Sequence, residues 1–248
     1  MTEADADRPR RRFLIVFAHY EPLSFNGAMR DTAVRELEAQ GHEVRVSDLY
    51  AEGFDPVPAR RDFSTCQRGD FFKYQTEQKH AVAENGFAPD IAREMEWLIW
   101  SDVVIFQFPL WWFSVPAILK GWFDKVLAYG FAYGGGRWFE NGPLRPRRAL
   151  LSMTAGAPSE RYSEGAIFGD IRHVIYPIHV GVFNLCGLAA LEPAIVWAPA
   201  RIGPERRAEE LDRYAERLKG LAEELPIPIH NTKDHPDPMA GNQAYFRV

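Results

Sequence analysis

The apolar residues of this 248-residue chain gather in short runs, and the stretches between the runs have helical spacing. Residues 13–18 and 103–108 are almost wholly apolar, which is typical of parallel strands buried on both faces of a sheet. Five parallel strands are predicted in all, at residues 13–18, 42–50, 103–108, 149–155 and 188–198.

Helical patterns separate most of these strands. Residues 28–40 are predicted to form a helix that ends at Gly41, and a second helix begins at Pro89 and Asp90. A third helix ends within residues 181–187, and residues 204–225 form a strongly amphipathic helix. This alternation predicts a doubly wound α/β sheet. Residues 51–88 are polar and irregular, so a long excursion with at most short helical pieces is expected after the second strand.

Length and composition favour a single domain that acts on small molecules. A chain with 46% hydrophobic residues can bury one large core over 13–225, with a disordered lead-in at 1–12 and a surface arm at 226–248. The net charge of −5 provides no overall basic field for nucleic acid. Two widely separated cysteines indicate reduced thiols in the cytoplasm and no metal site, and no apolar run is long enough for membrane insertion.

The third strand runs directly into an aromatic loop. Trp111, Trp112 and Phe113 follow its carboxyl end, where open α/β sheets bind their ligands. The alternative is that these side chains only pack the core, as aromatic residues usually do. Because a loop at a strand end is expected to be polar, the cluster favours a slot for a flat aromatic cofactor. Trp122 and Phe123, on the following helix, are predicted to lie in the core.

The loop after the first strand could bind phosphate. It carries His19, Ser24 and Asn26 immediately before a helix, whose amino terminus attracts anions. Ser24 or Asn26 could equally act only as a helix cap, and His19 could be a solvated imidazole. The GxGxxG fingerprint of dinucleotide-binding folds does not occur, so a flavodoxin-like phosphate loop remains open.

Two further loops hold candidate residues. After the fourth strand, Thr154 and Gly156 would let a ring edge approach the backbone, and Tyr162 could donate a hydrogen bond to a carbonyl. By itself this is a weak signal. Tyr133 lies among other aromatic residues before a glycine run, which could also be a flexible loop with incidental aromatics.

The ordered motifs resemble the NAD(P)H:quinone oxidoreductase family of flavodoxin-fold flavoproteins. The resemblance spans roughly residues 13–220. Its motifs are HYEPLSFNGAM, SDLYAEGFDPV, FQFPLWWFSVPAILKGWFDKV, FAY at 131–133 and NGPL.

The resemblance implies a homodimer that binds one FAD per subunit, with FMN as the second choice, in a pocket at the subunit interface. NAD(P)H and a quinone would take turns there in ping-pong hydride transfer, with Tyr162, Trp112 and Tyr133 as the catalytic residues. The cofactor-binding residues implied are His19, Ser24, Phe25, Asn26, Ala28, Pro109, Leu110, Trp111, Trp112, Phe113, Thr154, Gly156, Tyr162 and Arg207.

Several positions depart from the family pattern and suggest a rebuilt acceptor pocket. Phe168 stands where a proton-relay histidine is usual, Gly135 replaces a second pocket tyrosine, and Arg161 replaces an apolar residue. Arg161 could hold an anionic substrate or point to solvent; solvent is favoured because arginine is mostly exposed. Two other functions stay open: reduction of a nitro, azo or enone substrate, and a non-enzymatic ancillary flavoprotein that regulates a transport partner. The sequence carries no signal for NADH against NADPH.

Overall fold

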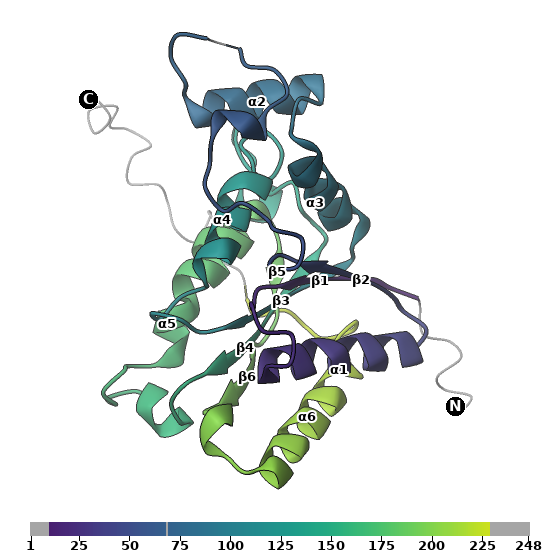
Figure 1. The fold of residues 1–248 in the computed structure, drawn as a ribbon, viewed down its shortest axis with the longest axis vertical. Helices are drawn as coiled ribbons and strands as arrows, with labels where there is room; N and C mark the ends of the chain where they lie inside the picture. Colours follow the sequence, from purple (N-terminus) through teal and green to yellow (C-terminus); the bar gives the residue numbers. More distant parts are fainter. Residues whose placement is uncertain (1–9, 68, 229–248) are drawn as a thin grey trace.

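The computed structural model describes residues 10–67 and 69–228, which form one parallel sheet covered by helices on both faces (Figure 1). The strand order is β2-β1-β3-β4-β5, and β6 also pairs with β4. The strands are β1 (Arg12–Phe17), β2 (Glu43–Asp48), β3 (Val103–Pro109), β4 (Arg148–Ala155), β5 (Ala189–Ala190) and β6 (Ala194–Trp197). The prediction of a doubly wound, five-stranded parallel sheet is confirmed, with the fifth strand broken into two pieces.

Helices α1 and α6 cover one face of the sheet, and α3, α4 and α5 cover the other (Figure 1). The helices are α1 (Phe25–Ala39), α2 (Tyr74–Glu84), α3 (Pro89–Trp100), α4 (Ala117–Val126), α5 (Ile171–Ile178) and α6 (Pro204–Leu218), and a π-helical segment, His179–Asn184, extends α5.

Alternation along the strands divides the apolar side chains between two cores. In β1, Phe13 and Ile15 pack with the α1 and α6 side, while Leu14 and Val16 pack with the α3, α4 and α5 side. Because successive side chains of a strand point to opposite faces, an uninterrupted apolar run fills both cores. Trp122 and Phe123 lie in the larger core, as expected.

The excursion after β2 is more ordered than the sequence suggested. The expectation of only short helical pieces is wrong, because α2 spans Tyr74–Glu84. Because α2 has few apolar residues, the sequence shows no apolar periodicity that would predict it. Tertiary contacts stabilise this helix. Lys125 of α4 donates to Asp62 over 2.9 Å with both groups buried, and Tyr74 donates to the same carboxylate over 2.8 Å. Burial and this hydrogen bond raise the pKa of Tyr74 well above its usual value.

Other boundaries differ from the predictions by a few residues. Helix α1 begins at Phe25 because Ser24 caps it, and α6 ends at Leu218. Pro193 separates β5 from β6, since proline cannot donate a hydrogen bond to a strand ladder. Of the predicted lead-in and arm, residues 1–9 and 229–248 lie outside the described part of the chain. None of the described helices is long and apolar enough to cross a membrane.

The close packing of α4 on the excursion depends on glycine. A Cβ atom on Gly121 would lie 2.3 Å from the carbonyl oxygen of Pro56. We therefore expect Gly121→Ala to lower the free energy of unfolding by about 1–3 kcal/mol in urea titrations. Gly181→Ala is the control, because a Cβ atom there would meet nothing within 4 Å beyond the adjacent backbone of its own helix. Equal effects of the two substitutions would contradict this account.

The π-helical segment predicts a dependence of stability on pH. Burial lowers the pKa of His179 to about 4, and among the described residues its Nε2 atom is enclosed without a hydrogen-bond partner. The pKa of His179 is lower in the folded state than in the unfolded state. The neutral imidazole therefore contributes fully to the free energy of unfolding above the unfolded-state pKa, and this contribution is lost as the pH falls toward 4. Between pH 7 and 5 the loss is about 2 kcal/mol. Urea titrations at both pH values should show a smaller loss of unfolding free energy in His179→Gln than in the native protein. His173→Gln should lose as much as the native protein, because the imidazole of His173 is exposed.

Candidate cofactor site at the strand ends

A chain of buried polar side chains crosses the carboxyl ends of the central strands. Gln107 of β3 donates from Nε2 to Oδ1 of Asn26 over 2.8 Å, and Asn26 donates from Nδ2 to Oγ1 of Thr154 over 2.9 Å. The three residues come from β3, the first turn of α1 and β4, and each is at most 6% exposed. Hydrogen-bonded polar groups in an otherwise apolar interior fix their neighbours in one geometry. The structure thus joins Asn26 and Thr154, which the sequence analysis listed separately.

The loop after β1 is a tight entry to α1. Ser24 accepts from the backbone N–H of Gly27 over 3.1 Å and so caps α1. The backbone N–H of Glu21 donates to Nδ1 of His19 over 3.0 Å, and the His19 ring lies 6.1 Å from the Trp111 ring. The loop therefore contacts the aromatic loop after β3. Phe25 packs against the α1 and α6 core, and Ala28 donates to the Ser24 carbonyl.

The aromatic loop is a strained reverse turn. Trp111 and Ser114 exchange two backbone hydrogen bonds of 3.0 Å, and the central residues, Trp112 and Phe113, have φ angles of 52° and 59°. A turn with positive φ at both central positions is type I′, which favours asparagine and glycine. Large side chains in the left-handed region cost about 1–3 kcal/mol each, and such strain clusters at functional sites.

The turn presents its aromatic side chains to solvent. Trp112 is 97% exposed, which is unusual for the largest side chain of the twenty amino acids, and Phe113 is 46% exposed. Pro109 and Leu110 lead into the turn, and the backbone N–H of Leu110 donates to the Thr154 carbonyl over 2.8 Å. The turn is therefore tied directly to the end of β4.

Phe113 extends into a cluster with two residues of the following loop. Its ring lies 5.5 Å from Phe168 and 6.1 Å from Tyr162. The Tyr162 ring also lies 5.2 Å from Trp197, at the end of β6. Burial raises the pKa of the Tyr162 phenol, which is already a hydrogen-bond donor at neutral pH at its ordinary pKa. Arg161 is exposed, as expected, and its guanidinium lies above the Phe168 ring.

Three predicted residues lie at the edges of this group or outside it. Gly156 is exposed, with no atom within 4 Å of its would-be Cβ, so its backbone is open to approach. Arg207, near the start of α6, donates to the carbonyl of Pro199, which follows β6. Tyr133 lies apart from this group and accepts a 3.1 Å hydrogen bond from Gln75 of α2. The structure shows no contact of Tyr133 with the aromatic turn among its described residues.

Sequence reasoning missed two members of the site. Gln107 is the polar residue within the strand VVIFQFP, and that interruption of an apolar run was the available signal. Trp197 ends β6 beside Ala155 of β4, but no pattern distinguished it from a core residue.

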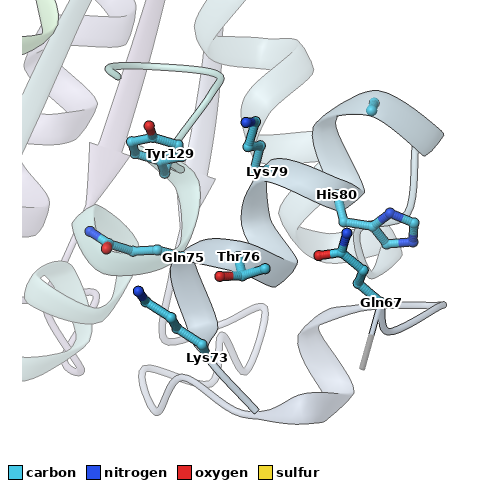
Figure 2. A pocket seen from close by; sticks show the side chains of 8 residues that line it. Gln67, Lys73, Gln75, Thr76, Lys79, His80 and Tyr129 are labelled. Carbon is cyan, nitrogen blue, oxygen red and sulfur yellow. The ribbon is translucent and has the colours of Figure 1, made fainter. Parts of the chain in front are cut away.

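The excursion has a separate cavity of about 560 Å³, lined mainly by α2 (Figure 2). Lys73, Lys79 and His80 contribute to its lining, but Figure 2 shows Lys73 and His80 extending to different sides of α2. The basic groups therefore do not converge on one point. We place the candidate site at the strand ends, where several loops meet.

Comparisons with known proteins identify the relatives of this chain. Residues 11–221 match a family described by its flavodoxin-like fold. The chain is 42% identical over 218 residues to NAD(P)H dehydrogenase (quinone) 1 of Rattus norvegicus, covering 88% of this chain and 80% of the relative. It is 41% identical over 219 residues to ribosyldihydronicotinamide dehydrogenase (quinone) of Homo sapiens, covering 88% and 95%.

A solved structure gives the same result. A Klebsiella pneumoniae protein assigned as a quinone reductase superposes with a TM-score of 0.86 at 39% identity, covering 90% of this chain and 89% of that one. Fold and strand-end site together define an α/β protein of the flavodoxin-like class. The chain belongs to the flavodoxin-like family that contains these quinone dehydrogenases, which confirms the resemblance found in the sequence.

The exposure of Trp112 predicts that its indole contributes little to folding. We expect Trp112→Gly to leave the free energy of unfolding unchanged or to raise it by about 1 kcal/mol, because glycine relieves the positive φ angle. Trp122→Ala is the contrasting variant: its indole is fully buried and donates to Glu94, so we expect a loss of about 3–5 kcal/mol. Urea titrations measure both values. A comparable loss in Trp112→Gly would mean that the indole has a structural role.

Proposed function

We propose that this protein is a flavin-dependent oxidoreductase that uses NAD(P)H to reduce quinones. The observation that carries the proposal is the strained turn that exposes Trp112 and that Leu110 ties to Thr154, the hydrogen-bond partner of the buried Asn26. An exposed indole on a strained backbone does not stabilise the folded chain. It would stabilise a flat ring that stacks against it. The quinone dehydrogenase names of the relatives agree with this assignment.

The residues present fit a flavin. Trp112, with Phe113, would supply the flat wall, and Thr154 and the open backbone at Gly156 would face a ring edge. Ser24 and Asn26 lie where the amino terminus of α1 attracts phosphate, and His19 closes that loop. When bound, a flavin supplies the two-electron chemistry that no side chain offers.

The protein's own contribution would be position and polarity. The aromatic turn would hold the nicotinamide or quinone ring parallel to the flavin, and binding both in one place in turn would give ping-pong exchange. Tyr162, whose phenol is protonated at neutral pH, would donate a hydrogen bond to the flavin or to the acceptor. Phe168, in contact with Tyr162 and Phe113, offers no proton, so proton transfer at that position would have to use water or the substrate.

We assign FAD in preference to FMN. Arg207 is exposed near the amino terminus of α6, beyond the loop that follows β6. A second phosphate and an adenosine would extend along this edge, and a guanidinium pairs well with phosphate. The ordered excursion, anchored by Lys125 and Asp62, would extend the binding surface as in the long members of the family.

A homodimer would complete the pocket. Leu23, Trp112 and Ile167 are each more than 80% exposed around the candidate site, and exposed apolar groups of this kind mark interaction surfaces. Tyr133 does not reach the aromatic turn of its own subunit, so it would contribute to the pocket of the partner. Sedimentation should then give about twice the 28.3 kDa mass of the chain.

Reconstitution and anaerobic titration test this function. The purified protein should take up FAD more tightly than FMN, lose its yellow colour with NADH or NADPH, and regain it when a quinone is added. Trp112→Gly should remain folded but bind FAD about tenfold or more weakly, because base or ring stacking on an aromatic side chain contributes about 1–3 kcal/mol. A protein that binds neither flavin, or whose reduced form does not react with quinones, would refute the proposal.

A further inference from the structure

Gln107 is a buried amide with an incomplete set of partners. Its Oε1 atom has no hydrogen-bond partner among the residues that the structure describes, although the side chain is fully buried. An apolar residue of equal size would pack in the same place without a desolvated carbonyl. Packing alone therefore does not explain why this residue is a glutamine. The functional part of its side chain is the N–H donor.

The contacts of Nε2 fix the direction of that donor. Nε2 donates to Oδ1 of Asn26 over 2.8 Å and lies 3.7 Å from the sulfur of Met29. Turning the Gln107 and Asn26 amides around together would keep a hydrogen bond between them, but it would place Oε1 against the Met29 sulfur, which can only accept. The Met29 contact therefore sets the orientation. Asn26 must then accept from Gln107 through its oxygen, and its own Nδ2 faces Thr154.

The orientation of the Asn26 amide determines which hydrogen bond the Thr154 hydroxyl can make. Its Oγ1 atom accepts the 2.9 Å hydrogen bond from Asn26, so its hydroxyl hydrogen is left to donate elsewhere. Thr154 is 6% exposed, next to Pro109 at the end of β4. No other hydrogen bond of its side chain is present in the described part of the chain, so the free hydrogen belongs to the strand-end site.

We propose that Gln107 is a positioning residue that fixes the Asn26 amide and thereby makes the Thr154 hydroxyl a hydrogen-bond donor toward the bound cofactor. This inference rests on the proposed flavin site. A donor aimed at a ring stabilises the state with more electron density, so the relay would favour the reduced flavin over the oxidised one.

The reduction potential of bound flavin tests the relay. Gln107→Met keeps the length of the side chain and removes the donor, and Thr154→Val removes the hydroxyl. We expect each to weaken binding of reduced relative to oxidised flavin by about tenfold, which is about 30 mV for a two-electron couple. The double variant should show no larger shift than either single one, because both remove the same hydrogen bond.

Ser152→Ala is the matched control. Ser152 lies two residues before Thr154 on the same face of β4, opposite Gln107 in the sheet register, and donates to Tyr214 over 2.9 Å. Its loss therefore removes an equally buried hydroxyl from the same surroundings without removing a hydrogen bond to Gln107, Asn26 or Thr154. It should leave the potential unchanged. Loss of stability in Gln107→Met without a shift in potential would show a purely structural role and overturn the proposal.

A second measurement needs no flavin. The side-chain amide signals of Asn26 in NMR spectra of the flavin-free protein, assigned through Asn26→Ala, should shift and exchange faster in Gln107→Met and stay unchanged in Ser152→Ala. Unchanged Asn26 signals in Gln107→Met would refute the relay even if the protein binds flavin. Failure of the native protein to bind flavin, with the Asn26 shift present, would instead refute the proposed function and the cofactor end of the relay.

Discussion

Burial of the central strands on both faces is the constraint on which the rest of this molecule depends. β1, β3 and most of β4 contribute apolar side chains to two cores, so these strands have almost no room for polar chemistry along their length. Polar groups and ligand contacts are confined to the strand ends and the loops that follow. The three loops that carry the candidate site, after β1, β3 and β4, meet for this reason.

Two kinds of cost at the strand ends distinguish the candidate site from ordinary loop structure. The backbone cost lies in the turn at Trp112 and Phe113, where bulky residues adopt positive φ angles. The desolvation cost lies at Gln107, whose carbonyl oxygen is buried without a partner in the described structure. Natural proteins accept such departures mainly where function requires them, and here the two lie on the same strand and loop.

The excursion has a different physical basis from the sheet. Its position depends on the buried ion pair of Lys125 with Asp62 and on the contact of Gly121 with Pro56, together with a cluster of aromatic rings formed by Phe63, Phe72, Tyr74 and Phe87. A buried ion pair that loses one partner leaves an uncompensated charge, so this attachment is specific in geometry. The excursion therefore brings α2 and the Tyr133 loop into a defined place beside the sheet, where Gln75 contacts Tyr133.

The sequence alone determined the class of fold, the order of most strands and helices, and the aromatic loop as part of the candidate site. These features depend on local periodicity and on the rule that strand ends meet at one edge. Helix α2 and the type I′ turn were decided by tertiary contacts that outweigh local propensity, whereas the break at Pro193 follows from the missing N–H of proline. The chain from Gln107 through Asn26 to Thr154 joins residues 81 and 128 positions apart. Local patterns contain no information on such pairs, so only the folded structure could reveal which polar side chains act together.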